Sequence, residues 1–297
     1  MANIGRQTSG VSLPSELTNE IWGKTQEASA IMRLARKIDL PGSGVTVHQI
    51  TGEAAADWVG ETNEKPVSTA TIGNKAMTPY KLAVIETFSN EFRRDAGALY
   101  DELARRLPNA LGKKFDETVF HATSGPGSNF GLLEAAPVLT VDGTNTYADL
   151  VAVDTAIATA GGELNGWVFA PKGKATLLNA SDTTNRPLFL GNLQTEGSVG
   201  SVFGSPVLFS RHAYKADAAG DDGEVIGFAG DWSSAIYGTV NGIEVAMSDQ
   251  ATVNIAGTQT NLWQRNMFAL RVEVEIGFQV HDINQFVKIT SGVNSVS

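Results

Sequence analysis

One apolar stripe in the middle of the chain limits the possible folds more than any other feature. Residues 98–122 carry an apolar side chain at every fourth position, the spacing that gathers side chains on one face of an α-helix. The stripe consists of Leu99, Leu103, Leu107, Leu111, Phe115 and Val119. At about 1.5 Å per residue this helix would be roughly 37 Å long. Pro108 predicts a bend between Arg105 and Pro108, because an interior proline removes one helical hydrogen bond.

The last part of the chain carries a β pattern of similar length. Residues 266–280 alternate between apolar and polar, which predicts a long antiparallel strand with one apolar face. That face consists of Phe268, Leu270, Val272, Val274, Ile276 and Phe278. Shorter strands are predicted at 45–50, 80–88, 166–171, 205–210 and 224–232, and helices at 147–160 and 172–180. Thr146 and Asp149 have capping-box spacing for the helix that they begin. Because no regular βαβ repeat joins these elements, the fold class is α+β.

The first eighty residues predict two appendages. Residues 11–38 indicate a helical, partly extended arm that is interrupted at Gly23 and detached from the body of its own chain. Residues 51–80 indicate a long hairpin between two strands, with a reach of roughly 50 Å. Trp58 and Val59 lie within it, in a run too polar and too broken for a helix or a core strand. An indole buries on the order of 200 Å² when it finds a partner. Apolar groups that a single chain cannot bury indicate burial by neighbouring subunits.

Composition narrows the class of protein. At 297 residues the chain can form one large domain or two closely wound ones. It has no cysteine, which excludes disulfides, thiolate nucleophiles and thiolate metal ligands. We expect neither a secretion signal nor a membrane span, because the N-terminal pattern and the apolar runs do not fit either. A net charge of −10 argues against tight, sequence-independent wrapping of nucleic acid.

The sequence contains no pattern typical of an active site. The four histidines, His48, His121, His212 and His281, lack metal-binding spacing and are expected to be satisfied or solvated. The glycine-rich run at 125–131 follows a helix, whereas phosphate-binding loops follow a strand, so a turn is expected. The carboxylate pairs Asp101–Glu102 and Asp116–Glu117 are interpreted as a solvated helix face. No catalytic, cofactor-binding or metal-binding residue is predicted.

The candidate functional residues are therefore contacts between subunits. Three basic doublets around the long helix favour salt bridges within or between subunits: Arg93–Arg94, Arg105–Arg106 and Lys113–Lys114. Six acidic residues in the same region balance these six basic ones. A nucleic-acid-binding stripe is the other interpretation of these doublets. The intersubunit contact candidates are Trp58, Val59, Glu61, Glu64, Lys65, Arg93, Arg94, Arg105 and Arg106.

The order of the motifs resembles the major capsid proteins of tailed bacteriophages with the Hong Kong 97-type fold. The similarity runs from LPSELTNEIW at 13–22 to INQFVKIT at 283–290. Its most specific part is residues 56–96, which are similar to the E-loop of that family and the strand after it. GPGSNFGLL at 125–133 resembles the turn that follows the spine helix of the family, and residues 166–192 resemble a later strand and helix. Asn185 stands where glycine is common in the family.

The resemblance implies a division of the chain into five parts. It implies an N-terminal arm with a first strand at 1–50, an E-loop at 51–82 and a peripheral domain with the spine helix at 83–146. An axial domain at 147–242 and a return segment to the peripheral domain at 243–297 complete the division. Lys65 and Lys75 lie in the implied E-loop, and some members of the family crosslink a lysine there. No acceptor for such a crosslink is assigned.

The resemblance also implies the function and the partners. The implied protein is not an enzyme and has no cofactor. It assembles as pentamers and hexamers into an icosahedral virion shell around double-stranded DNA, in the host cytoplasm. The implied partners are further copies of the chain, a separate scaffolding protein, a portal and a decoration protein. Two alternatives stay open from the sequence: an encapsulin-type nanocompartment shell, and a soluble ligand-binding enzyme with an acidic cleft.

Overall fold

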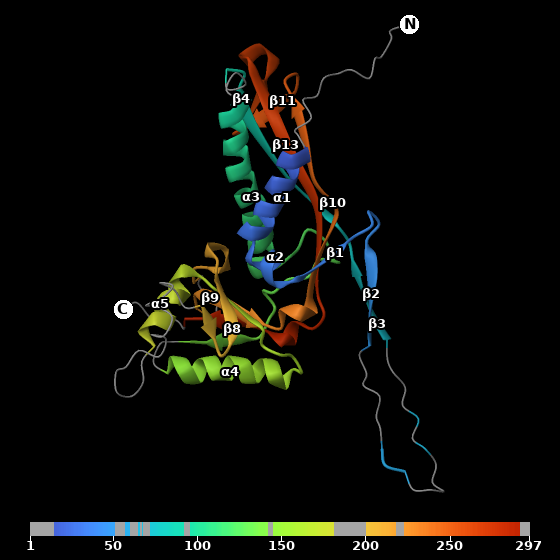
Figure 1. The fold of residues 1–297 in the computed structure, drawn as a ribbon, viewed down its shortest axis with the longest axis vertical. Helices are drawn as coiled ribbons and strands as arrows, with labels where there is room; N and C mark the ends of the chain where they lie inside the picture. The colour runs from blue at the N-terminus through green and yellow to red at the C-terminus, as the bar shows by residue number, and fades with distance from the viewer. Residues whose placement is uncertain are drawn as a thin grey trace.

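The protein is built on two β-sheets with helices packed against them (Figure 1). The computed structural model describes residues 15–50, 57–59, 65, 67, 72–91, 96–141, 145–180, 200–217 and 223–291. No helix within these ranges is both long enough and apolar enough to cross a bilayer. The mixture of helices and largely antiparallel strands is the predicted α+β class.

The longer sheet has four strands in the order β1-β10-β13-β4. Its strands are β1 (Arg36–Asp39), β4 (Tyr80–Ser89), β10 (Ala235–Ser248) and β13 (Met267–Val280). β13 pairs antiparallel with β10 on one side and with β4 on the other, while β1 joins β10 in parallel. All six predicted apolar residues of β13 are buried, which confirms the alternation.

Two helices cover the apolar face of this sheet. α1 (Ser15–Ala28) and α3 (Ala96–His121) lie side by side in Figure 1, and α1 also contacts β10. Leu107, Leu111, Phe115 and Val119 of the predicted stripe are buried against the sheet. The side chains of Leu99 and Leu103 lie outside the described residues. α3 continues through Pro108, and the predicted bend there stays a prediction.

The arm helix corrects two predictions. α1 continues through Gly23, where an interruption was predicted. A glycine costs a helix only about 1 kcal/mol, and the burial of Ile21 and Thr25 on either side offsets that cost. The arm is also not detached from its own chain, because α1 packs on α3. The break comes at Ser29, whose hydroxyl caps the short helix α2 (Ala30–Leu34) by accepting a bond from the Met32 amide at 3.1 Å.

The second sheet has six strands in the order β5-β14-β9-β6-β8-β7. Its strands are β5 (Val138–Thr140), β6 (Gly166–Phe169), β7 (Ser201–Val202), β8 (Ser205–Phe209), β9 (Val225–Gly230) and β14 (Phe286–Thr290). α4 (Thr146–Thr159) packs along this sheet, and α5 (Pro171–Asn179) contacts β6 and β9. β5 and β14 belong to this sheet although the predicted division assigns residues 83–146 and 243–297 to the peripheral domain. The domain division itself stays a prediction.

The start of α4 differs from the predicted capping box. Asn145, not Thr146, occupies the N-cap position and makes no side-chain cap bond. Thr146 is the first helical residue, and its hydroxyl is buried without a hydrogen-bond partner among the described residues, so it does not cap the helix. The predicted stop is confirmed: the chain leaves the helix at Gly161, which has the positive φ of +77° that glycine tolerates.

Two β-ribbons complete the fold. β2 (Val45–Ile50) pairs antiparallel with β3 (Ile72–Met77), and β11 (Thr252–Ile255) pairs with β12 (Thr258–Asn261). Short 3₁₀ helices are found at Arg211–Ala213, Trp232–Ser234, Trp263–Arg265 and Ile283–Gln285. The β2–β3 ribbon leaves the body of the molecule beside the four-stranded sheet (Figure 1). It occupies the base of the predicted hairpin.

Candidate subunit interface

Trp58 is the most exposed large apolar residue that the structure describes. Its relative exposure is 101%, and its own backbone amide donates to Asp57 Oδ1 at 2.8 Å. Val59 is exposed as well, and so is Lys65. The protein's own fold therefore leaves the indole entirely in solvent. The prediction that a neighbouring subunit covers it stays a prediction.

The other interface candidates are only partly described. Glu61, Glu64, Arg93 and Arg94 lie outside the described residues, and so does the side chain of Arg105. Arg106 is exposed on α3. The structure thus places the described candidates on two separate elements, the hairpin and the long helix, and does not bring them together within one chain.

The base of the hairpin is fixed by bonds to its own chain. Lys75 Nζ on β3 donates to the carbonyl oxygens of Val280 at 2.9 Å and His281 at 2.7 Å. Gln279 Nε2 donates to the carbonyl of Ala76 at 3.2 Å. These bonds set the direction in which the ribbon leaves the body. They also hold the amine of Lys75 within its own chain, which disfavours Lys75 as a crosslinking lysine.

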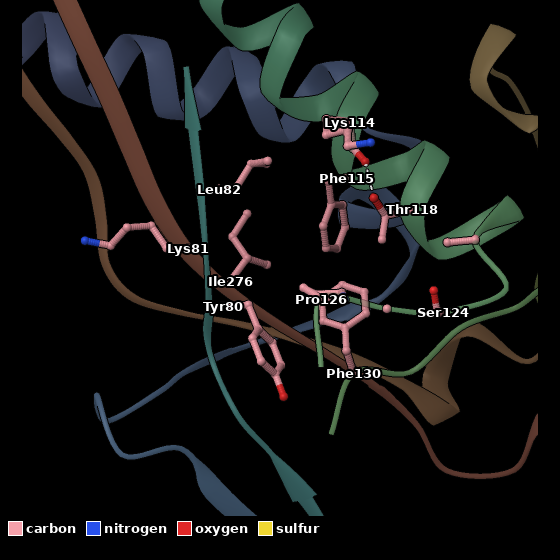
Figure 2. Close-up of a pocket in the computed structure, with 12 residues that line it drawn as sticks. Tyr80, Lys81, Leu82, Lys114, Phe115, Thr118, Ser124, Pro126, Phe130 and Ile276 are labelled. Atoms are coloured by element: carbon pink, nitrogen blue, oxygen red, sulfur yellow. Dashed lines mark hydrogen bonds between the residues drawn. The ribbon is translucent and has the colours of Figure 1, made fainter. Parts of the chain in front are cut away.

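A cavity of about 390 Å³ opens next to this base, between β4, α3 and the turn that follows α3. Figure 2 shows Tyr80, Phe115 and Phe130 around it. Phe130 meets both other rings edge-on, with centroid distances of 6.1 Å to Tyr80 and 6.4 Å to Phe115. Leu82 and Ile276 from the sheet add to its apolar lining, which no aspartate or glutamate interrupts.

The glycine-rich turn forms one wall of this cavity. A side-chain carbon at Gly127 would lie 2.2 Å from the Tyr80 hydroxyl, so only glycine lets the turn approach that ring. Asn129 Nδ2 donates to Thr78 Oγ1 at 3.1 Å and ties the turn to the start of β4. The prediction of a turn at 125–131 is confirmed, and its structural task is to close the cavity.

Asp116 was predicted to be solvated, and that prediction is wrong. The side chain is fully buried between α3 and the junction of α1 with α2. Its carboxylate accepts bonds from the Ser29 hydroxyl at 2.5 Å and the Ala30 amide at 2.9 Å. Burial raises the pKa of Asp116 from its ordinary 3.8 to about 7, although these bonds act in the opposite direction. A side chain on α3 therefore caps α2 and holds the arm on the long helix.

A second line of residues beside the apolar stripe would have revealed this contact. Pro108, Gly112, Asp116 and Phe120 recur every four positions on α3, and all four are buried. A side-chain carbon at Gly112 would lie 3.4 Å from the Cβ of Ala28, an ordinary van der Waals distance, so α1 packs directly on this position of α3. The buried face is wider than the six stripe residues suggest, and Asp116 lies within it.

A half-buried ionic cluster lies between the end of α3 and the six-stranded sheet. Glu134 Oε1 pairs with Lys215 at 2.9 Å and Lys288 at 3.4 Å. His121 Nε2 donates to the carbonyl of His212 at 2.9 Å, and burial lowers the pKa of His121. Nε2 of His121 is thus paired within the fold, whereas its Nδ1 is buried without a hydrogen-bond partner in the described part of the chain, so the prediction of a satisfied histidine holds for one ring nitrogen only. Within the described ranges, no three histidine, aspartate or glutamate side chains gather as a metal site.

Comparison with known proteins identifies the family. The model of the phage capsid family matches residues 9–291. The chain belongs to the phage capsid family. It is 28% identical to the probable major capsid protein of Mycobacterium phage L5, over 94% of this chain and 89% of that one. It is 24% identical to the major capsid protein of Staphylococcus phage 80alpha, over 94% and 84%.

Solved structures from two phages and from a GTA capsid share the fold of this phage capsid protein. The match to a structure from Gordonia phage Cozz has a TM-score of 0.70 at 26% identity, covering 88% of this chain and 86% of that one. A structure from Mycobacterium phage Adephagia gives a TM-score of 0.73 at 22% identity, covering 90% and 91%. A capsid of an empty GTA particle gives 0.64 at 13% identity, covering 99% and 95%.

These matches test several of the predictions that were made from the sequence. The fold is α+β and of the Hong Kong 97 type, as the resemblance implied. The chain is a structural component of the virion capsid and not an enzyme, which removes the ligand-binding enzyme as an alternative. The curated relatives are phage capsid proteins, which favours a phage shell over an enzyme compartment.

Proposed function

We propose that this phage capsid protein is the major subunit of a phage head, assembling as pentamers and hexamers into an icosahedral shell around double-stranded DNA. One observation carries the proposal beyond family membership: Trp58, on a hairpin that leaves the body, is exposed at 101% in the isolated chain. A subunit that exposes an indole in this way is complete only when another molecule covers it.

The contact that buries Trp58 is weak by itself, but many copies of it together stabilise a shell. Burial of about 200 Å² of indole surface stabilises by roughly 5 kcal/mol at most, before the entropy of association is subtracted. A shell repeats that contact at every subunit, so weak and reversible contacts add up to a stable particle. Reversibility also lets misplaced subunits leave a growing shell.

The remaining candidates surround this apolar contact. Val59 extends the apolar surface beside the indole, and Glu61, Glu64 and Lys65 form a polar rim. Arg93, Arg94, Arg105 and Arg106 lie on and before α3 and supply cations for salt bridges between subunits. The proposed parts are an arm at 1–50, an E-loop at 51–82, a peripheral domain at 83–146, an axial domain at 147–242 and a return segment at 243–297.

The proposed partners follow from the shell. The main partner is the chain itself, with a scaffolding protein during assembly, a portal at one vertex and a decoration protein outside. The DNA is confined by the shell and is not bound in a sequence-specific way, because a net charge of −10 disfavours a continuous cationic surface.

Negative-stain electron microscopy of the purified protein tests the proposal. Uniform polyhedral shells, or rings of five and six subunits, are the expected result. Dispersed single subunits at high protein concentration, alone and with the scaffolding protein of the same phage, would contradict it. Extraction of nuclease-protected double-stranded DNA from particles made in infected cells separates a genome-filled head from an enzyme compartment.

A further inference from the structure

We propose that Trp58 of one subunit inserts into the aromatic cavity at the hairpin base of a neighbouring copy. The inference rests on the proposed self-assembly and adds the surface that receives the indole. It joins the most exposed apolar residue described to the cavity between β4, α3 and the turn at 125–131.

The size and lining of the cavity fit an indole. A cavity of about 150 Å³ with an apolar lining can hold a benzene ring, so about 390 Å³ leaves room for the two rings of a tryptophan. Phe130 already meets Tyr80 and Phe115 edge-on, and an aromatic guest continues that arrangement (Figure 2). The exposed Ser124 and the half-buried Thr118 lie at the mouth, where the indole N–H can find a hydroxyl partner.

Charge favours the same pairing. Residues 51–65 around Trp58 contain four acidic residues, Glu53, Asp57, Glu61 and Glu64, and one basic residue, Lys65. The cavity is lined by two lysines and no acid. Lys81 turns away from the aromatic rings toward Glu273, at 3.3 Å, whereas Lys114 is exposed beside them. Lys114 is therefore the cation that faces an incoming acidic loop.

The occupant is a second copy and not the same chain. The described Trp58 is fully exposed while the cavity of its own chain is open. Donor and receiver are different surfaces, so the contact is head-to-tail: each subunit gives its indole to one neighbour and receives one from another. Such contacts close into rings when the rotation between subunits is a fraction of a full turn, which is the geometry of the proposed pentamers and hexamers.

A crosslink between chains tests the pairing directly. The chain has no cysteine, so Asp57→Cys combined with Lys114→Cys places the only two thiols at the proposed charge pair while the indole stays. In assembled particles, a short bis-maleimide should link these positions between chains and give dimers and closed rings on a denaturing gel. The matched control combines Asp57→Cys with Lys172→Cys on α5, which should give no links between chains.

A second variant tests the cavity without a crosslinker. Ser124→Trp fills the mouth from the same chain and should lower the yield of particles at least tenfold, whereas Ser124→Ala should not. The thermal unfolding of the free Ser124→Trp subunit should match that of the unaltered subunit. If it unfolds earlier, Lys114→Glu, with partial recovery by Asp57→Lys, takes its place as the test.

The outcomes separate this inference from the proposed function. Shells that form normally but give no links between positions 57 and 114, or only links within one chain, overturn the inference and leave the shell proposal standing. Efficient linking of position 114 to a cysteine placed within residues 1–14 of a neighbour, instead of position 57, assigns the cavity to the arm and also overturns it. Failure of the unaltered protein to assemble overturns both.

Discussion

At the scale of single residues, Asp116 shows how a charged side chain can belong to the interior. Its carboxylate accepts bonds from the Ser29 hydroxyl and the Ala30 amide, so its polar atoms are satisfied although water is excluded. Desolvation still dominates and raises the pKa to about 7. The stability of the subunit should therefore depend on pH near neutrality.

The sign of that dependence follows from proton linkage. Between pH 3.8 and about 7 the folded protein holds a proton on Asp116 that the unfolded chain has released. Stability should therefore fall as pH rises across this window and level off above it, by on the order of 4 kcal/mol in total. Asp116→Asn keeps an acceptor for Ser29 but cannot ionise, so its stability should change much less between pH 4.5 and 7.5.

Urea unfolding of the unassembled subunit at several pH values measures this effect. Glu117→Gln is the matched control, because the neighbouring residue is only half-buried and its change should leave the slope in place. Parallel curves for Asp116→Asn and the unaltered protein would show that this carboxyl is not the source of the pH dependence.

Trp58 is a second single residue that carries a prediction, and it is fully exposed whereas Asp116 is buried. Trp58→Ala removes no contact within the described chain, so the free subunit should keep its stability within about 0.5 kcal/mol. Each intersubunit contact should weaken by about 2 kcal/mol or more, as for other buried aromatic anchors. Particles should form in lower yield and disassemble at lower temperature, as measured by light scattering. Trp58→Phe should recover part of the loss, and heat-stable particles from Trp58→Ala would contradict the proposed contact.

At the scale of elements, the buried faces of single helices and strands were predictable from the sequence. The packing of α1 on α3 was not. The alternation of β13 and the stripe of α3 place apolar side chains on one face whatever the partner is, so local sequence determines them. The end of α1 docks beside Gly112 and Asp116, which lie 84 and 88 residues after its last residue, Ala28. No local pattern in residues 11–38 contains that information. Trp58 could be picked out as a contact candidate because the residues around it fit neither a helix nor a core strand. The cavity that we propose receives it could not, because three segments far apart in the sequence form it.

The docking of the arm can be measured in the free subunit. Ile21 on α1 is fully buried in the main core, so Ile21→Ala should lower the free energy of unfolding by about 2 to 5 kcal/mol. Glu20→Ala on the exposed side of the same helix should cost about 0.5 kcal/mol or less, since only the exposed Lys24 pairs with it. Denaturant titration of unassembled subunits gives both values. A negligible effect of Ile21→Ala before assembly, with a large one after it, would mean that the arm docks only on a neighbour.

At the scale of the whole molecule, the excess of acidic residues predicts how the proposed shell holds the DNA that we propose it encloses. A protein that holds DNA through many phosphate contacts loses affinity steeply as salt rises, whereas a closed container does not. With a net charge of −10, intact shells should retain their DNA equally well at about 0.1 M and about 1 M salt. Nuclease protection after incubation at each concentration measures retention. Progressive loss of protected DNA with salt would indicate direct binding to the inner surface.

The packing of α1 on α3 of its own chain has a consequence for how fast and how accurately shells can grow. Because α1 is already packed on α3 in the free chain, the conformational entropy of its fourteen residues is lost when the chain folds and not when two subunits meet. The arm helix of an incoming subunit is thus preorganised, and association has little left to order along residues 15–28. Its on-rate then depends mainly on orientation, and errors can be corrected by release of a folded unit, because detachment does not require the arm to unravel.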